Sequence, residues 1–171
     1  RRSRRREVVA AICSESPDFV IHTGDLVERG RSPERWKIFY EDSAPLLRRR
    51  FLYPVAGNHE YKGEFSGAYF DLFHESIGTA RSYAFRAGAA YFIFFDSVAK
   101  PHPGAKDSLN IHATWFRERL KDAGDSAFLF VVFHHPAFST GHGRARRFLF
   151  ARQSGHAPRS EERNLRGVLA D

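Results

Sequence analysis

Three short polar motifs stand at points of the chain where an apolar stretch, and with it an expected strand, comes to an end. They are Gly24-Asp25, Gly57-Asn58-His59-Glu60 and His134-His135-Pro136. Carboxylate, carboxamide and imidazole groups are ligands of two-metal sites, in which divalent ions about 3.5–4 Å apart hold an attacking hydroxide and neutralise a phosphoryl group. The motifs therefore predict metal-dependent hydrolysis of phosphate esters.

The candidate residues differ in what they can supply. Asp25 has two oxygens and a full negative charge, so it is expected to bridge the two ions. Asn58 would add a neutral oxygen, and His134 a ring nitrogen suited to Mn, Fe or Zn. His59 directly follows a ligand, so its ring should point elsewhere and could protonate the leaving alkoxide.

Taken singly, these residues allow plainer interpretations. An Asp after Gly is typical of a turn, and Asn-His is typical of a loop. Glu60 is expected to cap or pair locally rather than bind metal, whereas His135 could either meet the substrate or brace its loop through Pro136. The occurrence of all three motifs at expected strand ends favours a functional site.

Composition sets the class of protein. The 171 residues are 42% hydrophobic, which is enough for one compact domain over 1–171 with its own core. No apolar run is long enough to span a bilayer. The single cysteine, Cys13, excludes an intrachain disulfide and a thiolate metal cage. A first residue other than Met, without a signal-peptide pattern, indicates a piece of a longer protein, and neither localisation nor oligomeric state is predicted.

The formal net charge is +7, and a run of arginines at the start supplies a good part of it: Arg1, Arg2, Arg4, Arg5 and Arg6. Such a run is typical of a solvated helix start, but its field could also attract a phosphorylated small molecule or macromolecule. Nucleic-acid binding stays open without being favoured, because the aromatic residues lie mostly in strand-like runs rather than among the basic ones.

The elements that must position the motifs follow from hydrophobic periodicity and from Gly and Pro. Residues 61–80 and 100–107 are expected to be irregular. Alternating strands and helices predict an α/β fold, in which side chains beyond the carboxyl ends of strands lie where ligands bind. Strands are predicted at 18–22, 51–56 and 127–133, a hairpin around Gly88 at 82–95, and helices at 6–14, at 108–122, from Pro33 and from about Glu161.

The stretch Gly24–Gly30, the Gly-Asn-His-Glu motif and the His-His-Pro motif resemble the middle three motifs of the calcineurin-like metallophosphoesterases. Phe95-Asp96-Ser97, the helix around Trp115 and the loop from Pro136 to Gly143 are most similar to the purple acid phosphatase branch. The resemblance implies a four-layer α-β-β-α sandwich of two facing mixed sheets. It also implies a dinuclear centre of divalent or trivalent Mn, Fe or Zn at their edge.

The resemblance also implies roles for residues. It makes Asp25 the bridging ligand, Asn58 and His134 ligands of one metal, and His59 the acid or a phosphate-facing histidine. His142 falls where the purple acid branch keeps another phosphate-facing histidine, and Arg29 where an arginine contacts phosphate in some members and braces the loop in others.

Two family motifs have no counterpart in these 171 residues: the Asp motif that opens the family and the Gly-His-x-His motif that closes it. The chain is therefore interpreted as a fragment that lacks the first and last metal motifs. Glu28 stands where purple acid phosphatases have a tyrosine, so their colour is not expected. The alternative function is a catalytically inactive domain of this family that serves as a binding or scaffold module.

Overall fold

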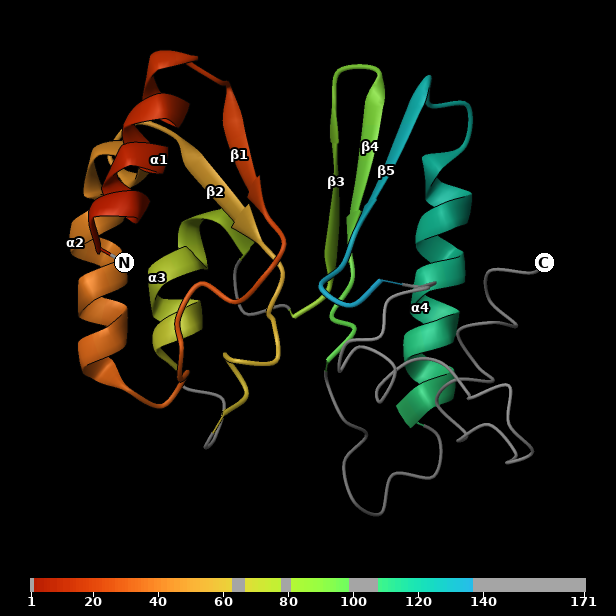
Figure 1. Ribbon diagram of the computed structural model, residues 1–171. Helices are drawn as coiled ribbons and strands as arrows, with labels where there is room; N and C mark the ends of the chain where they lie inside the picture. Colours follow the sequence, from red (N-terminus) through yellow and green to blue (C-terminus); the bar gives the residue numbers. More distant parts are fainter. Residues whose placement is uncertain (1, 63–66, 78–80, 99–107, 137–171) are drawn as a thin grey trace, which may run out of the picture. The chain divides into compact units, whose positions relative to one another are not determined.

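The computed structural model describes residues 2–62, 67–77, 81–98 and 108–136, with the side chains of 74–77 and 108–112 left aside (Figure 1). The chain divides into two compact units, Arg1–Tyr83 and Ala84–Asp171, and each is described by itself. That residues 1–171 form a single domain stays a prediction. None of the helices in the described ranges is both long and apolar enough to cross a membrane.

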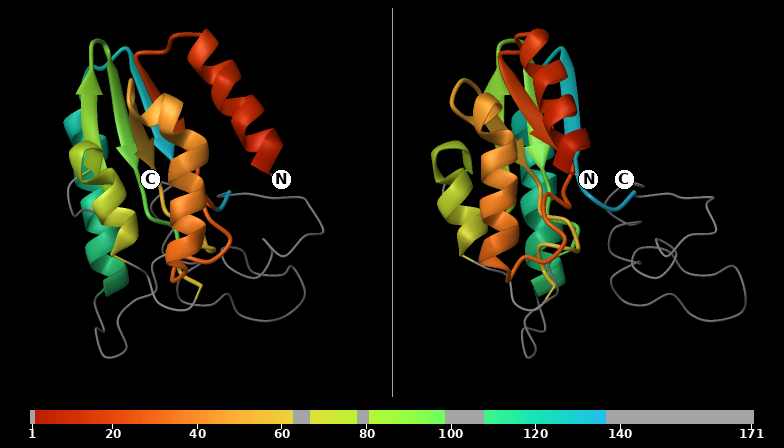
Figure 2. Two further views of the ribbon diagram at one scale, coloured as in Figure 1. Left: turned by 90° about the vertical axis from the view of Figure 1, so that its left-hand side faces the viewer. Right: turned by 60° about the vertical axis from the view of Figure 1, so that its left-hand side comes forward.

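Unit 1 is built on a parallel pair of strands. Its elements are α1 (Arg2–Ser14), β1 (Phe19–His22), α2 (Pro33–Leu47), β2 (Phe51–Pro54) and α3 (Ala68–Ile77). The strands pair from Phe19 opposite Phe51 to His22 opposite Pro54, and one further hydrogen bond runs from Val55 N to His22 O at 3.0 Å. The helices lie on one side of this pair, as Figures 1 and 2 both show. The expected strands and the first two helices are thus present.

Helix α2 begins where its sequence predicts. The side chain of Ser32 accepts a hydrogen bond from Arg35 N, and Pro33 occupies the first turn, where its missing N–H leaves no hydrogen bond unmade. One face of α2 then packs into the core of unit 1. That core contains Leu26, Val27, Trp36, Phe39, Leu52, Ala56, Tyr69 and Phe73, each buried.

Helix α3 corrects the sequence prediction, which made residues 61–80 irregular. The segment is rich in Gly, Ser and aromatic residues, but Tyr69 and Phe73 are four positions apart and therefore share one helix face. Their rings meet edge to face with centroids 5.3 Å apart, and both side chains are buried in the core. Burial of this aromatic face outweighs the weak helix propensity of the segment.

The arginines of α1 are not simply solvated, as the sequence suggested. Asp42 on α2 is fully buried, and its Oδ1 accepts hydrogen bonds from Arg6 Nε at 2.8 Å and Arg2 Nη2 at 3.2 Å. Arg5 Nη1 lies 3.8 Å from Oδ2. Burial alone would raise the pKa of Asp42, but the hydrogen bonds and charges of Arg6 and Arg2 outweigh it and hold that pKa below its usual range. The basic helix is thereby fixed to α2.

The second sheet has the order β3 (Tyr83–Ala87), β4 (Ala90–Phe94) and β5 (Phe128–Val132). Residues 88–89 join β3 and β4 as the predicted hairpin, and β4 and β5 run parallel. Helix α4 (Ser108–Ala123) lies on one side of this sheet (Figure 1). The predicted loop at 100–107 and the predicted helix from Glu161 lie outside the described residues.

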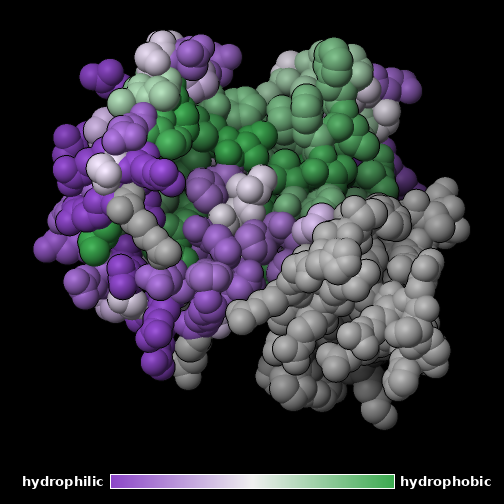
Figure 3. Space-filling view, in the orientation of Figure 1, coloured by the Kyte–Doolittle hydropathy of each residue, from purple (hydrophilic) through white to green (hydrophobic). Residues whose placement is uncertain are grey.

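Helix α4 is packed against the second sheet, whereas part of β5 is exposed. Phe116 and Ala123 of α4 are buried with Tyr91, Ile93 and Phe95. On β5 the residues Phe128, Leu129 and Phe130 are exposed. Figure 3 shows this hydrophobic surface over β5, and a mainly hydrophilic surface over α1 and α2.

Candidate functional site

The loop after β1 bends sharply to present Asp25. Gly24 has a φ of +96°, and Asp25, which is not a glycine, has a φ of +59°. Both values lie in the left-handed region, which Gly adopts freely and Asp more readily than most residues. Gly24 therefore allows the backbone to bend tightly at the end of β1. The Asp25 side chain ends up exposed at the end of the strand.

The buried carboxylate of Glu60 ties the loop after β1 to the loop after β2. Its Oε2 accepts hydrogen bonds from Asp25 N at 2.8 Å and Gly57 N at 2.7 Å, and its Oε1 accepts one from Val27 N at 3.1 Å. Burial raises the pKa of Glu60, and the nearby charge of Asp25 adds to the rise, whereas the three backbone donors lower it. Glu60 thus pairs as the sequence predicted, but with two partners on another loop.

A second tie between the loops runs through Gly30. Its N–H donates to His59 O at 2.9 Å, while its own carbonyl accepts from Trp36 Nε1 at 2.6 Å. A Cβ at this position would lie 1.7 Å from the carbonyl oxygen of Glu60, so only glycine allows the two backbones to approach so closely. Gly30 therefore sets the separation of the two loops.

His59 contacts both the carboxylate and the backbone of the facing loop. Its backbone N–H donates to Asp25 Oδ1 at 3.0 Å, and its ring Nε2 lies 3.8 Å from Asp25 Oδ2. Its ring Nδ1 lies 3.0 Å from Glu28 O. Asn58 is half-buried beside it, and Arg29 is exposed on the loop after β1. Four of the predicted site residues therefore lie on these two joined loops.

Lys62 is a residue of this site that the sequence analysis missed. Its Nζ lies 2.8 Å from Nε2 and 3.2 Å from Nδ1 of His59. Lys62 N also donates to His59 O at 3.2 Å, which closes a turn. The available signal was a lysine three residues after the candidate acid, a spacing at which a turn brings two side chains together.

The remaining predicted residues follow β5 in unit 2. His134 is half-buried and His135 is buried, and their rings meet edge to face at 4.8 Å. His135 N donates to Ser97 Oγ at 3.1 Å, and this hydrogen bond joins the segments that follow β4 and β5. The relation of His134 to Asp25 and Asn58 stays a prediction, as does a substrate role for His135. His142 lies outside the described residues.

The donors of the loops in unit 1 suit a metal ion. Asp25 and Asn58 offer a carboxylate and a carboxamide oxygen, which bind first-row divalent ions and can do so together with an imidazole. No group of three or more His, Cys, Asp or Glu side chains that could hold a metal ion is present in the part of the chain that the structure describes. The donor chemistry therefore fits the predicted metal, and the complete ligand set stays a prediction.

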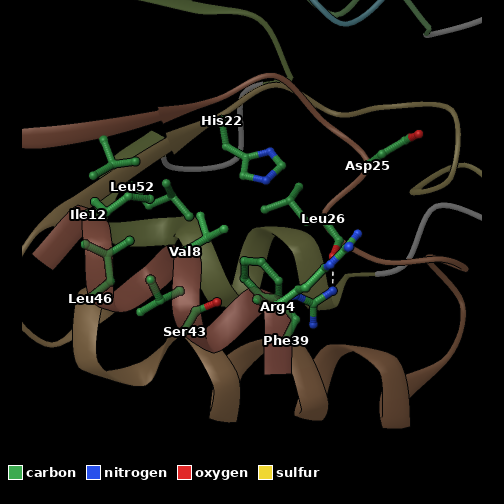
Figure 4. Close-up of a pocket in the computed structure, with 13 residues that line it drawn as sticks. Arg4, Val8, Ile12, His22, Asp25, Leu26, Phe39, Ser43, Leu46 and Leu52 are labelled. Carbon is green, nitrogen blue, oxygen red and sulfur yellow. Dashed lines mark hydrogen bonds between the residues drawn. The ribbon is translucent and has the colours of Figure 1, made fainter. Parts of the chain in front are cut away.

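A cavity of about 280 Å³ in unit 1 has Asp25 among its lining residues. Its lining is mainly apolar and includes Val8, Ile12 and Leu46, with Arg5 Nη2 donating to Leu26 O at 3.3 Å at one side. Figure 4 shows Asp25 at the edge of this cavity with its carboxylate pointing away from the apolar interior. The cavity is therefore not part of the site formed by the two loops.

The chain matches one family model and a curated relative. The model of the calcineurin-like phosphoesterase family matches residues 1–160. The chain is also 32% identical over 134 residues to the glycerophosphodiester phosphodiesterase GpdQ of Enterobacter lignolyticus (strain SCF1), an alignment that covers 76% of this chain and 46% of that protein. The chain thus spans less than half the length of this relative.

The family match confirms the resemblance that the motifs suggested, and with it the predicted α/β fold of the metallo-dependent phosphatases. The narrower likeness to purple acid phosphatases stays a prediction. A match over most of the chain, together with the two joined strand-end loops, places this chain in the calcineurin-like phosphoesterase family.

Proposed function

We propose that the intact protein is a metal-dependent hydrolase of phosphoric esters and that the loops after β1 and β2 carry part of its active site. The observation that carries the proposal is the approach of the His59 ring to Asp25, with Nε2 3.8 Å from Oδ2, next to a hydrogen bond of 3.0 Å from the backbone N–H of His59 to Oδ1. A candidate metal-binding carboxylate and a candidate proton donor are thus in contact. Membership of the calcineurin-like phosphoesterase family supports the reaction class.

Asp25 and Asn58 would hold metal, with His134 as a further ligand, in a centre of two ions that are Mn, Fe or Zn. Such ions, when bound, supply Lewis acidity and activate water for attack on phosphorus. The protein holds the two oxygen donors in place through Glu60, which binds the backbone on both loops. Preorganisation of this kind lowers the cost of bringing ligands and substrate together.

His59 would protonate the leaving group. A carbonyl oxygen only accepts hydrogen bonds, so the contact with Glu28 O places a hydrogen on Nδ1 and leaves Nε2 on the side of Asp25. A proton taken up at Nε2 once the substrate is bound would pass to the leaving oxygen as its bond to phosphorus breaks. Arg29 and His135 would bind the phosphoryl group, and His142 would assist in catalysis.

One relative supports a choice of substrate class. The name of that protein describes a phosphodiesterase that acts on glycerophosphodiesters. We therefore propose a phosphodiester rather than a phosphomonoester as the preferred substrate of the intact protein.

The test uses the intact protein with added Mn or Zn. Hydrolysis of bis-p-nitrophenyl phosphate is expected to exceed that of p-nitrophenyl phosphate, and a chelator should abolish both. His59→Ala should lower kcat by about 10²–10⁴-fold, the usual contribution of a general acid. Lys37→Ala, which changes an exposed lysine of α2, is the control and should leave kcat unchanged.

Absence of turnover with either ester and either metal would contradict the proposal and support the inactive scaffold instead. Equal kcat for His59→Ala and Lys37→Ala would remove the role of His59 while leaving the reaction class in place.

A further inference from the structure

The ammonium group of Lys62 lies against the ring of His59, on the side of the candidate site. Its Nζ is 2.8 Å from Nε2, the same nitrogen that lies 3.8 Å from Asp25 Oδ2. The turn closed by the bond from Lys62 N to His59 O folds the lysine back over the imidazole. A positive charge is thus held next to the atom that would face the leaving group.

The contact with His59 is one that a phosphate oxygen can replace. An ammonium group has three donors and no acceptor, so one imidazole nitrogen satisfies only part of its capacity. An anionic phosphoryl oxygen accepts more strongly than a neutral ring nitrogen. The Lys62 side chain is exposed and flexible, which allows it to move by a few ångströms without loss of packing.

Two acidic side chains of the facing loop, Glu28 and Asp25, have contacts with other groups. Glu28 is directed to Arg35, with 3.3 Å between Oε2 and Nη2. Asp25 is directed to His59 and is the proposed metal ligand. Lys62 therefore places a positive charge directly beside the ring of His59.

We propose that Lys62 is a further substrate-binding residue, whose ammonium group binds a non-bridging oxygen of the phosphoryl group beside His59. The inference rests on the proposed function and adds a residue to it. On this basis Lys62 acts on the binding of the phosphoryl group rather than on the transfer of the proton.

The experiment measures kcat, KM and inhibition by inorganic phosphate on the intact, metal-loaded protein with bis-p-nitrophenyl phosphate. Lys62→Ala should raise both KM and the inhibition constant of phosphate about tenfold, as expected for one exposed charge-assisted hydrogen bond, with kcat within about threefold. Lys62→Arg should restore most of the binding. Lys37→Ala is the matched control, because Lys37 is an exposed lysine of α2 that lies 4.0 Å from Glu41.

Two results would overturn the inference. In one, Lys62→Ala and Lys37→Ala have the same KM and the same inhibition constant. In the other, Lys62→Ala lowers kcat with both binding constants unchanged, which would make Lys62 a positioning residue for His59.

Failure of the proposed function would look different. If the wild type hydrolyses neither ester, calorimetric binding of inorganic phosphate decides the matter. Weaker phosphate binding by Lys62→Ala than by the wild type would sustain the inference, and equal binding or none would refute it.

Discussion

Replacement of Glu60 tests whether one buried carboxylate holds the two site loops together. In Glu60→Ala the N–H groups of Val27 and Gly57 lose their acceptor inside the protein, and that of Asp25 loses it at the edge. Each buried donor without an acceptor costs about 1–3 kcal/mol. Burial of the charge, which raises the pKa of Glu60, offsets part of the gain from these bonds. We therefore expect a loss of about 3–5 kcal/mol in the free energy of unfolding.

Glu60→Gln removes the charge of residue 60 and nearly keeps the shape of its side chain. An amide oxygen in the place of Oε2 can still accept from Asp25 N and Gly57 N. The amide NH₂ then faces Val27 N, so two donors meet where a donor met an acceptor. Because Gln also removes the cost of burying a charge, its expected loss is smaller, about 1–2 kcal/mol.

The assay is urea unfolding of the intact protein, followed by circular dichroism at neutral pH. Glu118→Gln is the control, because Glu118 is an exposed residue of α4 whose carboxylate lies 4.0 Å from Arg119, and it should change stability by less than about 0.5 kcal/mol. The reasoning is refuted if Glu60→Gln matches the wild type and Glu60→Ala loses no more than Glu118→Gln.

Two further predictions follow from the packing of unit 1. Gly30→Ala should lose about 3 kcal/mol in the free energy of unfolding, the upper end for overpacking, because its Cβ would lie 1.7 Å from a backbone oxygen. Gly67→Ala, whose Cβ would have its nearest atom at 3.9 Å, should lose less than about 0.5 kcal/mol in the same urea unfolding assay. Asp42→Asn should lose about 2 kcal/mol at pH 7. Because the pKa of Asp42 is lowered by folding, this difference from the wild type is fully present above the ordinary value of 3.8 and should shrink as the pH falls below it. A difference in urea stability that stays constant from pH 7 to pH 3 would show that the charge of Asp42 is not what stabilises α1 on α2.

The local motifs could be predicted because they depend on short-range physics. An apolar run that ends in Gly-Asp or Gly-Asn-His indicates a strand followed by a tight loop, and parallel strands bring their carboxyl ends to one edge. The sequence therefore predicted both the strands β1 and β2 and the polar residues that follow them. The hairpin at Gly88 was predictable because a glycine between two apolar runs is typical of a tight turn. In the structure Gly88 has a φ of +56°, which other residues rarely adopt.

Helix α3 was missed because its stability does not reside in its own sequence. Its composition predicts a loop, and only the core of unit 1 supplies the apolar surface against which Tyr69 and Phe73 pack. Tertiary burial of a helix face decides such cases, because short helices are marginal in isolation.

The sequence by itself determined which residues could do chemistry and on which strand ends they stand. The tertiary structure decided how those residues are held: Glu60 binds backbone groups 33 and 35 residues away, and the arginines of α1 surround a carboxylate 36 and more residues away. Contacts of this kind leave no periodic trace in the chain, because they arise only when loop closure brings distant backbone and charged groups together. The buried position that makes Glu60 and Asp42 effective likewise exists only in the folded chain.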